Sequence, residues 1–472
     1  WEEMHGRELL EGKKYTKLGG KTIMGRLFGT DGARGVANTE LTAELAMNIG
    51  RAAAMVLVND EVKHPTILIG KDTRLSGDML EGALIAGLCS VGANVKLLGV
   101  VPTPAVAYLV KKYNADAGVM ISASHNPFEF NGIKIFSSEG YKLPDDLENR
   151  IEEIVLDHAV PYATANDGEI GRVDTLESAV DDYINHVAEA VGEDLSGMEV
   201  ALDCSNGSSS RTAEKLFTKL GVKVHMLFDE PDGININKDC GSTHTKKLQE
   251  YVSKNKLSAG LAFDGDADRC LAVDENGNLV DGDFLIAICA NDMMKNGKLK
   301  KNTAVGTVMT NMGFSKFCEA NGIDFVSTKV GDRYVLESML QNGYNIGGEQ
   351  SGHIIFLDHS TTGDGELSGA MLLSIMKRTG EKLSDLAKIM ERYPQVLINV
   401  KVSNEGKLSF YTDKEVKAEI NRVTEILGDT GRILVRVSGT EPLVRVMLEG
   451  ENLEQIQTLA EEAAQVVRER LA

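Results

Sequence analysis

Several features are scarce in this chain of 472 residues, and each absence excludes a class of protein. No run of about 18 apolar residues occurs, so the sequence contains no candidate membrane span. The six cysteines form no CxxC pair and no cluster, which excludes a zinc framework or a secreted disulfide scaffold and indicates free thiols in a reducing cytoplasm. Lys and Arg total 50 against 70 Asp and Glu, a formal charge of −20. This balance excludes a general nucleic-acid binder but leaves room for a local basic pocket that binds a small anion.

Apolar residues make up 42% of the chain, enough for several hydrophobic cores. Three stretches share one order of elements: a β-branched strand, a loop of small residues, a helix, and a glycine followed by another strand. They start at Thr66, Val200 and Thr303, and each continues into two apolar strands joined by a polar loop, at 122–127, 264–269 and 348–353. Self-similarity at a spacing of about 100 residues indicates repeated domains. Strands that alternate with helices predict α/β layers with mixed sheets.

The last part of the chain follows a different pattern. Residues 432–437 and 443–448 predict a hairpin, and amphipathic helices are expected at 412–427 and 453–471. We therefore expect a smaller α+β domain that starts near Tyr393. The predicted organisation is an N-terminal extension at 1–23, which could be a tag or a non-native start, followed by domains at 24–172, 173–273, 274–391 and 392–472. Each domain offers one polar loop at strand ends, where functional residues are usually found.

Asp264, Asp266 and Asp268 alternate along one of these loops. If the loop curls so that the carboxylates converge, two charges about 4 Å apart repel by roughly 4 kcal/mol at an effective dielectric near 20. A hard divalent cation such as Mg²⁺ or Ca²⁺ would remove this repulsion. The spacing of these residues and Glu275 also matches an EF-hand, but Arg269 stands at the glycine position and the flanks read as strands. A solvated acidic turn is a further alternative.

The loop at 122–127, Ser-Ala-Ser-His-Asn-Pro, places a serine beside a histidine. We expect an extended segment in which Ser124 and His125 point to opposite sides, a poor geometry for base catalysis. No GxSxG elbow is present either. Ser124 could still be a nucleophile if it carries a phosphoryl group whose charge a cation neutralises. A simple Ser/Asn/Pro turn is the alternative.

The two remaining loops favour a phosphorylated sugar. Hydroxyls, a glycine and two guanidinium groups, which suit a phosphate dianion, occur at Arg436, Ser438–Thr440 and Arg445. Glu349, Ser351 and His353 combine a carboxylate, a hydroxyl and an imidazole, natural partners of sugar hydroxyls. An ordinary surface arginine pair and a hydrogen-bonded turn are the respective alternatives. Together the four loops describe a nucleophile, a metal site, a hydroxyl-binding loop and a phosphate clamp.

From about Met24 to its end, the chain resembles the α-D-phosphohexomutases, most closely their bacterial phosphoglucosamine mutase branch. Five segments carry the resemblance in the expected order: 28–35 (Phe-Gly-Thr-Asp-Gly-Ala-Arg-Gly), 122–134, 264–269, 349–353 and 436–440. Gln350 and the segment Lys329–Tyr334 are similar to the glucosamine branch. Val437 departs from the pattern, because many relatives have proline there. Valine keeps the backbone N–H donor and leaves φ less restricted.

The resemblance implies a four-domain architecture, with three similar mixed-sheet α/β domains and a smaller α+β C-terminal domain. It implies the interconversion of glucosamine 6-phosphate and glucosamine 1-phosphate for UDP-N-acetylglucosamine and cell-wall precursor synthesis. Ser124 would carry a phosphoryl group, one Mg²⁺ would bind per chain, and glucosamine 1,6-bisphosphate would be the intermediate and activator. In this scheme Lys134 is a candidate general base or acid.

The residue roles that the resemblance implies fall into four groups. The catalytic group is Ser124, Arg34, Lys134 and Arg269, and the metal group is Ser124, Asp264, Asp266 and Asp268. The substrate-binding group is Lys329, Asp332, Arg333, Glu349, Ser351 and His353, and the phosphate-binding group is Arg436, Ser438, Gly439, Thr440 and Arg445.

Two other functions stay open at this point. A sister phosphohexomutase would prefer glucose or mannose phosphate, and a sugar-phosphate sensor would bind without turnover. We expect a cytoplasmic protein whose partner is a small sugar phosphate, without nucleic acid or membrane. The sequence leaves a homodimer open.

Overall fold

The computed structural model of the chain describes residues 26–29, 31–57, 64–438 and 442–472. The predicted extension at 1–23 lies outside them. The chain divides into two compact units. The first unit is Trp1–Gly192, Leu202–Lys247 and Ala262–Asp268, and the second unit is Glu193–Ala201, Leu248–Leu261 and Arg269–Ala472.

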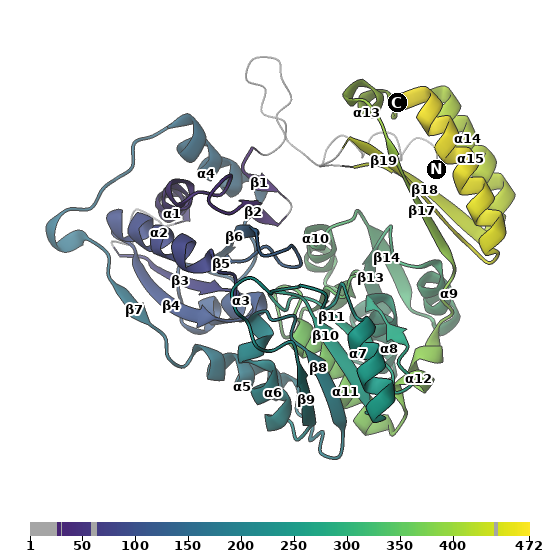
Figure 1. Cartoon of the computed structure of the whole chain (residues 1–472), viewed down its shortest axis with the longest axis horizontal. Helices are drawn as coiled ribbons and strands as arrows, with labels where there is room; N and C mark the ends of the chain where they lie inside the picture. The colour runs from purple at the N-terminus through teal and green to yellow at the C-terminus, as the bar shows by residue number, and fades with distance from the viewer. Residues whose placement is uncertain (1–25, 30, 58–63, 439–441) are drawn as a thin grey trace. The chain divides into compact units, whose positions relative to one another are not determined.

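Four sheets carry the described part of the chain (Figure 1). A seven-stranded sheet has the order β1 (Phe28–Gly29), β2 (Gly32–Val36), β6 (Phe130–Ser137), β5 (Ala117–Ile121), β3 (Thr66–Lys71), β4 (Asn94–Val100) and β7 (Val173–Thr175). A five-stranded sheet has the order β12 (Leu279–Val280), β11 (Cys270–Val273), β10 (Ala259–Phe263), β8 (Glu199–Asp203) and β9 (Lys223–Leu227). A four-stranded sheet has the order β14 (Asp324–Thr328), β13 (Thr303–Thr307), β15 (Ile346–Gly348) and β16 (Ile354–Phe356), and a three-stranded sheet has β17 (Gln395–Lys401), β19 (Leu443–Gly450) and β18 (Gly431–Val437).

Helices connect and cover these sheets. In the first part of the chain they are α1 (Ala43–Leu57), α2 (Gly77–Ser90), α3 (Thr103–Lys112), α4 (Asp145–Asp157), α5 (Ala179–Val191), α6 (Ala213–Lys219) and α7 (Lys246–Asn255). The others are α8 (Gly282–Lys295), α9 (Met312–Asn321), α10 (Asp332–Asn342), α11 (Gly365–Thr379), α12 (Leu383–Leu386), α13 (Asn404–Ser409), α14 (Lys414–Leu427) and α15 (Leu453–Leu471).

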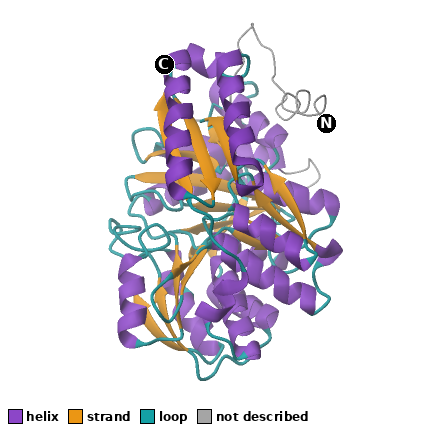
Figure 2. Cartoon of the chain, turned by 90° about the vertical axis from the view of Figure 1, so that its right-hand side faces the viewer, coloured by secondary structure: helices purple, strands orange, loops and turns teal. Residues whose placement is uncertain are grey.

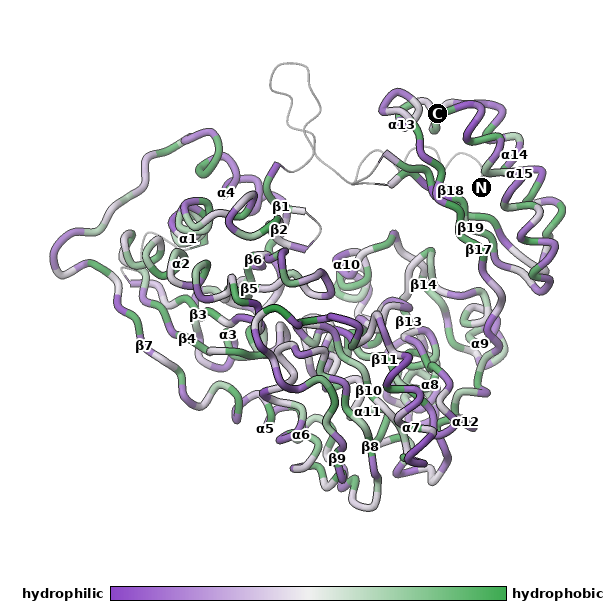
Figure 3. The backbone as a smooth tube through the Cα atoms, in the orientation of Figure 1, coloured by the Kyte–Doolittle hydropathy of each residue, from purple (hydrophilic) through white to green (hydrophobic). Residues whose placement is uncertain are grey.

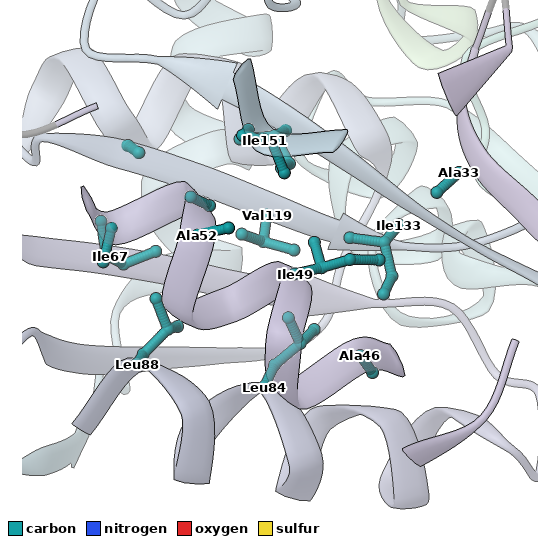
Figure 4. Close-up of a cluster of buried hydrophobic side chains, with 14 of the residues drawn as sticks. Ala33, Ala46, Ile49, Ala52, Ile67, Leu84, Leu88, Val119, Ile133 and Ile151 are labelled. Atoms are coloured by element: carbon teal, nitrogen blue, oxygen red, sulfur yellow. The ribbon is translucent and has the colours of Figure 1, made fainter. Parts of the chain in front are cut away.

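The core of the first unit forms where α1 and α2 pack on the seven-stranded sheet. Ile49 and Ala52 of α1 and Leu84 and Leu88 of α2 meet sheet residues such as Val119 (Figure 4). Helix α3 contacts the same sheet through β3, β5 and β6. Full burial of such a side chain contributes about 1.5–3 kcal/mol, so this core holds the strand ends that carry the loops.

The predicted triplication is visible in the strand pairing. Strand β3 pairs with β4 in parallel, as β13 does with β14, and β8 lies beside β9. Each of the three repeats then adds two neighbouring strands joined by a polar loop: β5–β6, β10–β11 and β15–β16. The mixed α/β architecture is therefore confirmed. The EF-hand alternative is wrong, because strands β10 and β11, and not helices, flank Asp264 and Asp268.

The three-stranded sheet has one apolar face and one face that mixes polar and apolar residues. Val444, Val446 and Leu448 of β19 belong to the core under α14 and α15, which lie side by side (Figure 2). The alternation of apolar and polar residues along α15 follows from its single buried face (Figure 3). Because side chains alternate along a strand, Arg445 and Glu449 point to the other face of the sheet. The predicted hairpin and both helices are confirmed.

All six cysteines are free thiols, as expected. Among the described residues, no helix combines the length and apolar character that a membrane span requires.

Candidate active site

Ser124 lies in the loop that connects β5 to β6, and its side chain is buried. Its backbone has a φ of 52°, in the left-handed region, so the predicted extended conformation is wrong. Because the chain turns here, the neighbouring side chains do not point to opposite sides. His125 Nδ1 is 3.3 Å from Ser124 Oγ. The hydroxyl of Ser124 donates a shorter hydrogen bond, of 2.6 Å, to Asp264 Oδ2.

Asp264, Asp266 and Asp268 converge in the loop between β10 and β11. All three are buried, and one oxygen from each carboxylate lies within 4.8 Å of the others. Asp266 Oδ1 is buried and has no hydrogen-bond partner among the described residues. Buried carboxylates repel each other strongly unless a cation compensates them. A set of hard oxygen donors with one unsatisfied oxygen fits a divalent cation such as Mg²⁺.

Lys134 of β6 supplies positive charge to the same cluster and is almost fully buried. Its ammonium lies 2.7 Å from Asp266, 3.0 Å from Asp31 and 3.6 Å from Asp268. Burial lowers the pKa of Lys134, but Asp266, Asp31 and Asp268 outweigh it and raise the pKa above its usual value. The raised pKa favours the protonated ammonium group, so Lys134 can stabilise negative charge, whereas proton transfer to or from it is disfavoured.

Asp31, Lys142 and Thr103 belong to this site but were not singled out in the sequence. Burial raises the pKa of Asp31, but Lys134, Lys142 and Arg34 outweigh it and hold the pKa well below its usual range. Asp31 accepts a hydrogen bond from Arg34 and one of 2.5 Å from Lys142. The hydroxyl of Thr103, in the first turn of α3, donates to Asp266 Oδ2 at 2.5 Å. Asp31 lies inside the segment 28–35, whereas no sequence pattern marks Thr103 or Lys142.

In the second unit, the loop at 349–353 meets the segment that precedes α10. The N–H of Gly331 donates to Glu349 Oε1 at 3.1 Å, and Asp332 Oδ2 is 3.6 Å from His353 Nε2. His353 Nε2 also accepts the N–H of Gly363 at 3.0 Å, which orients the ring. Ser351 Oγ is buried and has no hydrogen-bond partner in the described part of the chain, so it is available to a ligand hydroxyl.

Glycine is required at position 352 of this loop. Its φ is +93°, and an added Cβ would lie 2.3 Å from the carbonyl oxygen of Cys270. The N–H of Cys270 in turn donates to the carbonyl of Gly352 at 3.0 Å. Arg269 is the first residue of the segment Arg269–Ala472 of the second unit. It directly precedes Cys270 and is half-buried. The backbone therefore places Arg269 beside the loop at 349–353.

Arg436 of β18 and Arg445 of β19 stand directly opposite each other in the antiparallel register. Like charges at such a position are destabilising. Burial lowers the pKa of Arg436, and the charge of Arg445 lowers it further. Ser438, at the end of β18, is buried and its N–H donates to the carbonyl of Leu443 at 2.8 Å. A bound anion would relieve the repulsion between the two guanidinium groups, so their pairing indicates an anion site.

Replacing Arg445 with glutamine should therefore weaken binding of a phosphorylated ligand without unfolding the protein. We expect KM for the sugar phosphate to rise about 10- to 100-fold, because hydrogen bonds to charged groups contribute about 1.5–3 kcal/mol. Thermal stability should stay equal or rise, since a like-charge pair is removed. Steady-state kinetics and thermal melts measure both effects. Arg422→Gln, on the exposed side of α14, is the control. An unchanged KM for Arg445→Gln would contradict an anion site here.

The structure thus brings the predicted residues together in separate groups. Ser124, Arg34, Lys134 and the three aspartates form one group in the first unit. The second unit holds the loop at 349–353 with Asp332, and separately the arginine pair with Ser438.

The remaining predicted residues lie nearby in the sequence. Arg333 lies in the first turn of α10. Lys329 is exposed, and its ammonium lies 5.7 Å from the ring centroid of Tyr334. Gly439 and Thr440 lie outside the described residues. Val437 pairs with Val444, so β18 continues to the residue directly before Ser438.

Comparison with known proteins shows which family the chain belongs to. Four family models match in chain order, all described as phosphoglucomutase/phosphomannomutase: alpha/beta/alpha domain I at 25–159, domain II at 181–277, domain III at 281–393, and the C-terminal domain at 397–466. A phosphoglucosamine mutase of Acetivibrio thermocellus is 56% identical over 448 residues, which are 95% of this chain and 100% of that protein. The chain belongs to the phosphoglucosamine mutase family. The phosphoglucosamine mutase of Clostridium novyi is 55% identical over 95% of this chain and 99% of its own.

Solved structures agree on the fold of the family. A phosphoglucomutase/phosphomannomutase family protein of Burkholderia thailandensis is 23% identical, with a TM-score of 0.78, over 94% of this chain and 98% of that chain. The N-acetylphosphoglucosamine mutase of Aspergillus fumigatus, solved in complex with GlcNAc-6P and magnesium, is 18% identical, with a TM-score of 0.69, over 94% of this chain and 96% of its own. The predicted resemblance and the predicted fold class are both confirmed.

Proposed function

We propose that this chain interconverts glucosamine 6-phosphate and glucosamine 1-phosphate through a phosphorylated Ser124 and glucosamine 1,6-bisphosphate. Membership of the phosphoglucosamine mutase family over nearly the whole chain supports the reaction. The observation that carries the mechanism is the hydrogen bond of 2.6 Å between Ser124 Oγ and Asp264, inside a buried group of three converging aspartates. A serine in such a place can carry a phosphoryl group only if positive charge is supplied to it.

The three aspartates would hold Mg²⁺, which when bound supplies positive charge to the phosphoryl group and its neighbours. Lys134 is positioned to add charge to the same place, because its ammonium contacts Asp266 and Asp31. Arg34 is tied to Asp31 and belongs to the same group. With little covalent chemistry required of the protein, phosphoryl transfer depends mainly on positioning and on charge stabilisation.

The transfer itself is a balanced exchange. A hydroxyl of the sugar monophosphate attacks the phosphorus on Ser124, a new P–O bond forms to the sugar, and the P–O bond to Ser124 Oγ breaks. The proton of the sugar hydroxyl replaces the phosphoryl group on Ser124, directly or through a nearby base. The resulting bisphosphate turns around and returns its other phosphoryl group to Ser124, so the sugar leaves with its phosphate at the other position.

Two groups in the second unit would hold the substrate during these steps. Arg436, Ser438 and Arg445 would bind the phosphate that is not transferred, because the two arginines stand directly opposite each other on neighbouring strands. Glu349 and Ser351 would hydrogen-bond the sugar hydroxyls, and the buried His353 would support this loop. We assign Lys329, Asp332 and Arg333 to the same substrate-binding surface on the strength of the motif match. Arg269 would supply positive charge for the transfer, as the same match implies.

The test of this proposal is kcat/KM for glucosamine 6-phosphate, glucose 6-phosphate and mannose 6-phosphate. The assay contains Mg²⁺ and a trace of hexose 1,6-bisphosphate, and intact mass verifies phosphorylation of the enzyme. We expect a preference for the amino sugar of about 100-fold or more, about 2.7 kcal/mol in the transition state. A preference for glucose or mannose phosphate would assign the chain to a sister activity. Binding without turnover of all three would indicate a sensor.

A further inference from the structure

A buried ion pair follows strand β3 and has no part in the site described so far. The guanidinium of Arg74 and the carboxylate of Asp72 are both fully shielded from solvent, and Arg74 Nε donates to Asp72 Oδ2 at 2.9 Å. The backbone N–H of Arg74 also donates to Asp72 Oδ1, at 3.0 Å. Burying an arginine is costly unless all of its donors find acceptors. The remaining donors of Arg74 therefore need partners.

All of these partners are carbonyl oxygens of the loop that carries Ser124. Arg74 Nη2 donates to the carbonyls of Ser124 and Asn126, both at 2.9 Å. Arg74 Nη1 donates to the carbonyls of Pro127, at 2.5 Å, and Phe130, at 3.1 Å. Together with the bond from Nε, these use all five N–H donors of the guanidinium. A lysine has three donors on a single atom and cannot reproduce this pattern.

The N–H of Ser124 is tied to the same ion pair from its other side. It donates to Ser122 Oγ at 2.9 Å, and the hydroxyl of Ser122 donates to Asp72 Oδ2 at 2.6 Å. Both backbone groups of Ser124 therefore lead to Asp72 and Arg74. A left-handed φ costs energy for any residue with a side chain and persists only where the surroundings hold it. The ion pair supplies those surroundings.

The carbonyl of Ser124 also contacts the loop that carries the aspartates. An added Cβ at Gly265 would lie 2.5 Å from this oxygen, so only glycine allows the approach. The side-chain amide of Asn237 donates to the same carbonyl at 2.9 Å. These contacts fix the Ser124 backbone relative to the aspartate loop. They thereby also direct Oγ toward Asp264.

We propose that Arg74, held by Asp72, is a positioning residue for phosphoryl transfer at Ser124. Four of its five hydrogen bonds go to backbone carbonyls of residues 124–130, one of them to Ser124 itself, and fix the Ser124 backbone in the conformation that directs Oγ toward the aspartates. Ser122 extends this control to the N–H of Ser124. The role rests on the proposed function, since it concerns the same serine. Arg74 does not touch the substrate in this account, so its loss should change the transfer step and not substrate affinity.

The experiment measures how fast glucose 1,6-bisphosphate phosphorylates Ser124 in the dephosphorylated protein with Mg²⁺, by intact mass and peptide mapping. Arg74→Lys should slow this step about 100-fold, the size expected when a reacting group is misplaced by about 1 Å. Ser122→Ala, which removes one hydrogen bond, should slow it about 3- to 10-fold. For both variants we expect KM for the sugar phosphate and the apparent Mg²⁺ affinity to change less than about threefold.

Arg51→Lys is the matched control, because Arg51 lies on α1 and donates to Ser90 Oγ away from Ser124. It should phosphorylate at the wild-type rate. If Arg74→Lys does not fold, Ser122→Ala alone decides the question. Variant rates within twofold of the wild type, or losses equal to the unfolded fraction, would overturn the positioning role while the proposed function stands. Wild-type protein that gains no phosphoryl group on Ser124 would overturn both.

Discussion

Replacing Ser124 with alanine should abolish mutase turnover while leaving the fold and sugar-phosphate binding intact. The substitution removes the only atom on which the transferred phosphoryl group can reside in this account. We expect kcat to fall by about 10³-fold or more, which corresponds to about 4 kcal/mol or more of lost transition-state stabilisation. Turnover is measured with glucosamine 6-phosphate, and affinity by calorimetry on the same preparations.

The matched control is Ser138→Ala, at an exposed serine just after β6 in the same unit. This variant should retain wild-type turnover. A Ser124→Ala protein that still turns over at a tenth of the wild-type rate would contradict a phosphoserine mechanism. Wild-type protein that binds sugar phosphate as tightly as Ser124→Ala but turns over no better would instead support a sensor.

Removing the divalent cation should be nearly as damaging, because three buried carboxylates then remain without it. We expect chelation to reduce turnover by about 10³-fold and Mg²⁺ to restore it. Mg²⁺ should also raise the unfolding temperature, because an ion that binds only the folded state stabilises it by about 2.7 kcal/mol at 100 times its Kd. The second readout is independent of the reaction.

Asp268→Asn tests which residues hold the ion. Losing one charged ligand should raise the Mg²⁺ concentration for half-maximal thermal stabilisation on the order of 100-fold. Asp239→Asn, at an exposed position of the same unit, should leave this concentration unchanged. Equal Mg²⁺ responses in the two variants would show that the cation stabilises the protein from another site.

Much of the fold could be predicted from the sequence, because the strands and helices of each repeat have recognisable local patterns. Strands such as 66–71 and 303–307 are apolar, are bounded by small residues, and are followed by helices of ordinary length. The polar loops stand out because they interrupt apolar strands. The convergence of the aspartates was a conditional prediction, and the loop between β10 and β11 does curl as required.

The contacts that complete the site depend on the order of strands within a sheet and on contacts between loops of different sheets, neither of which a local pattern reveals. Asp31 meets Lys134 because β2 lies beside β6. Thr103 meets Asp266 across 163 residues of sequence, and Arg74 reaches Ser124 across 50. The contact between Ser124 and His125 was missed for a different reason. It depends on a left-handed backbone at a serine, which sequence propensity does not favour.

The most direct test of the central claim follows one phosphoryl group through Ser124. The wild-type protein is labelled with isotopically marked glucose 1,6-bisphosphate and Mg²⁺, freed of excess sugar, and mapped by peptide mass spectrometry before and after unlabelled glucosamine 6-phosphate is added. We predict that the label sits on Ser124 and then moves into the sugar phosphates within a few turnovers. A label that sits on another residue, or that stays on Ser124 while product forms, would contradict the account.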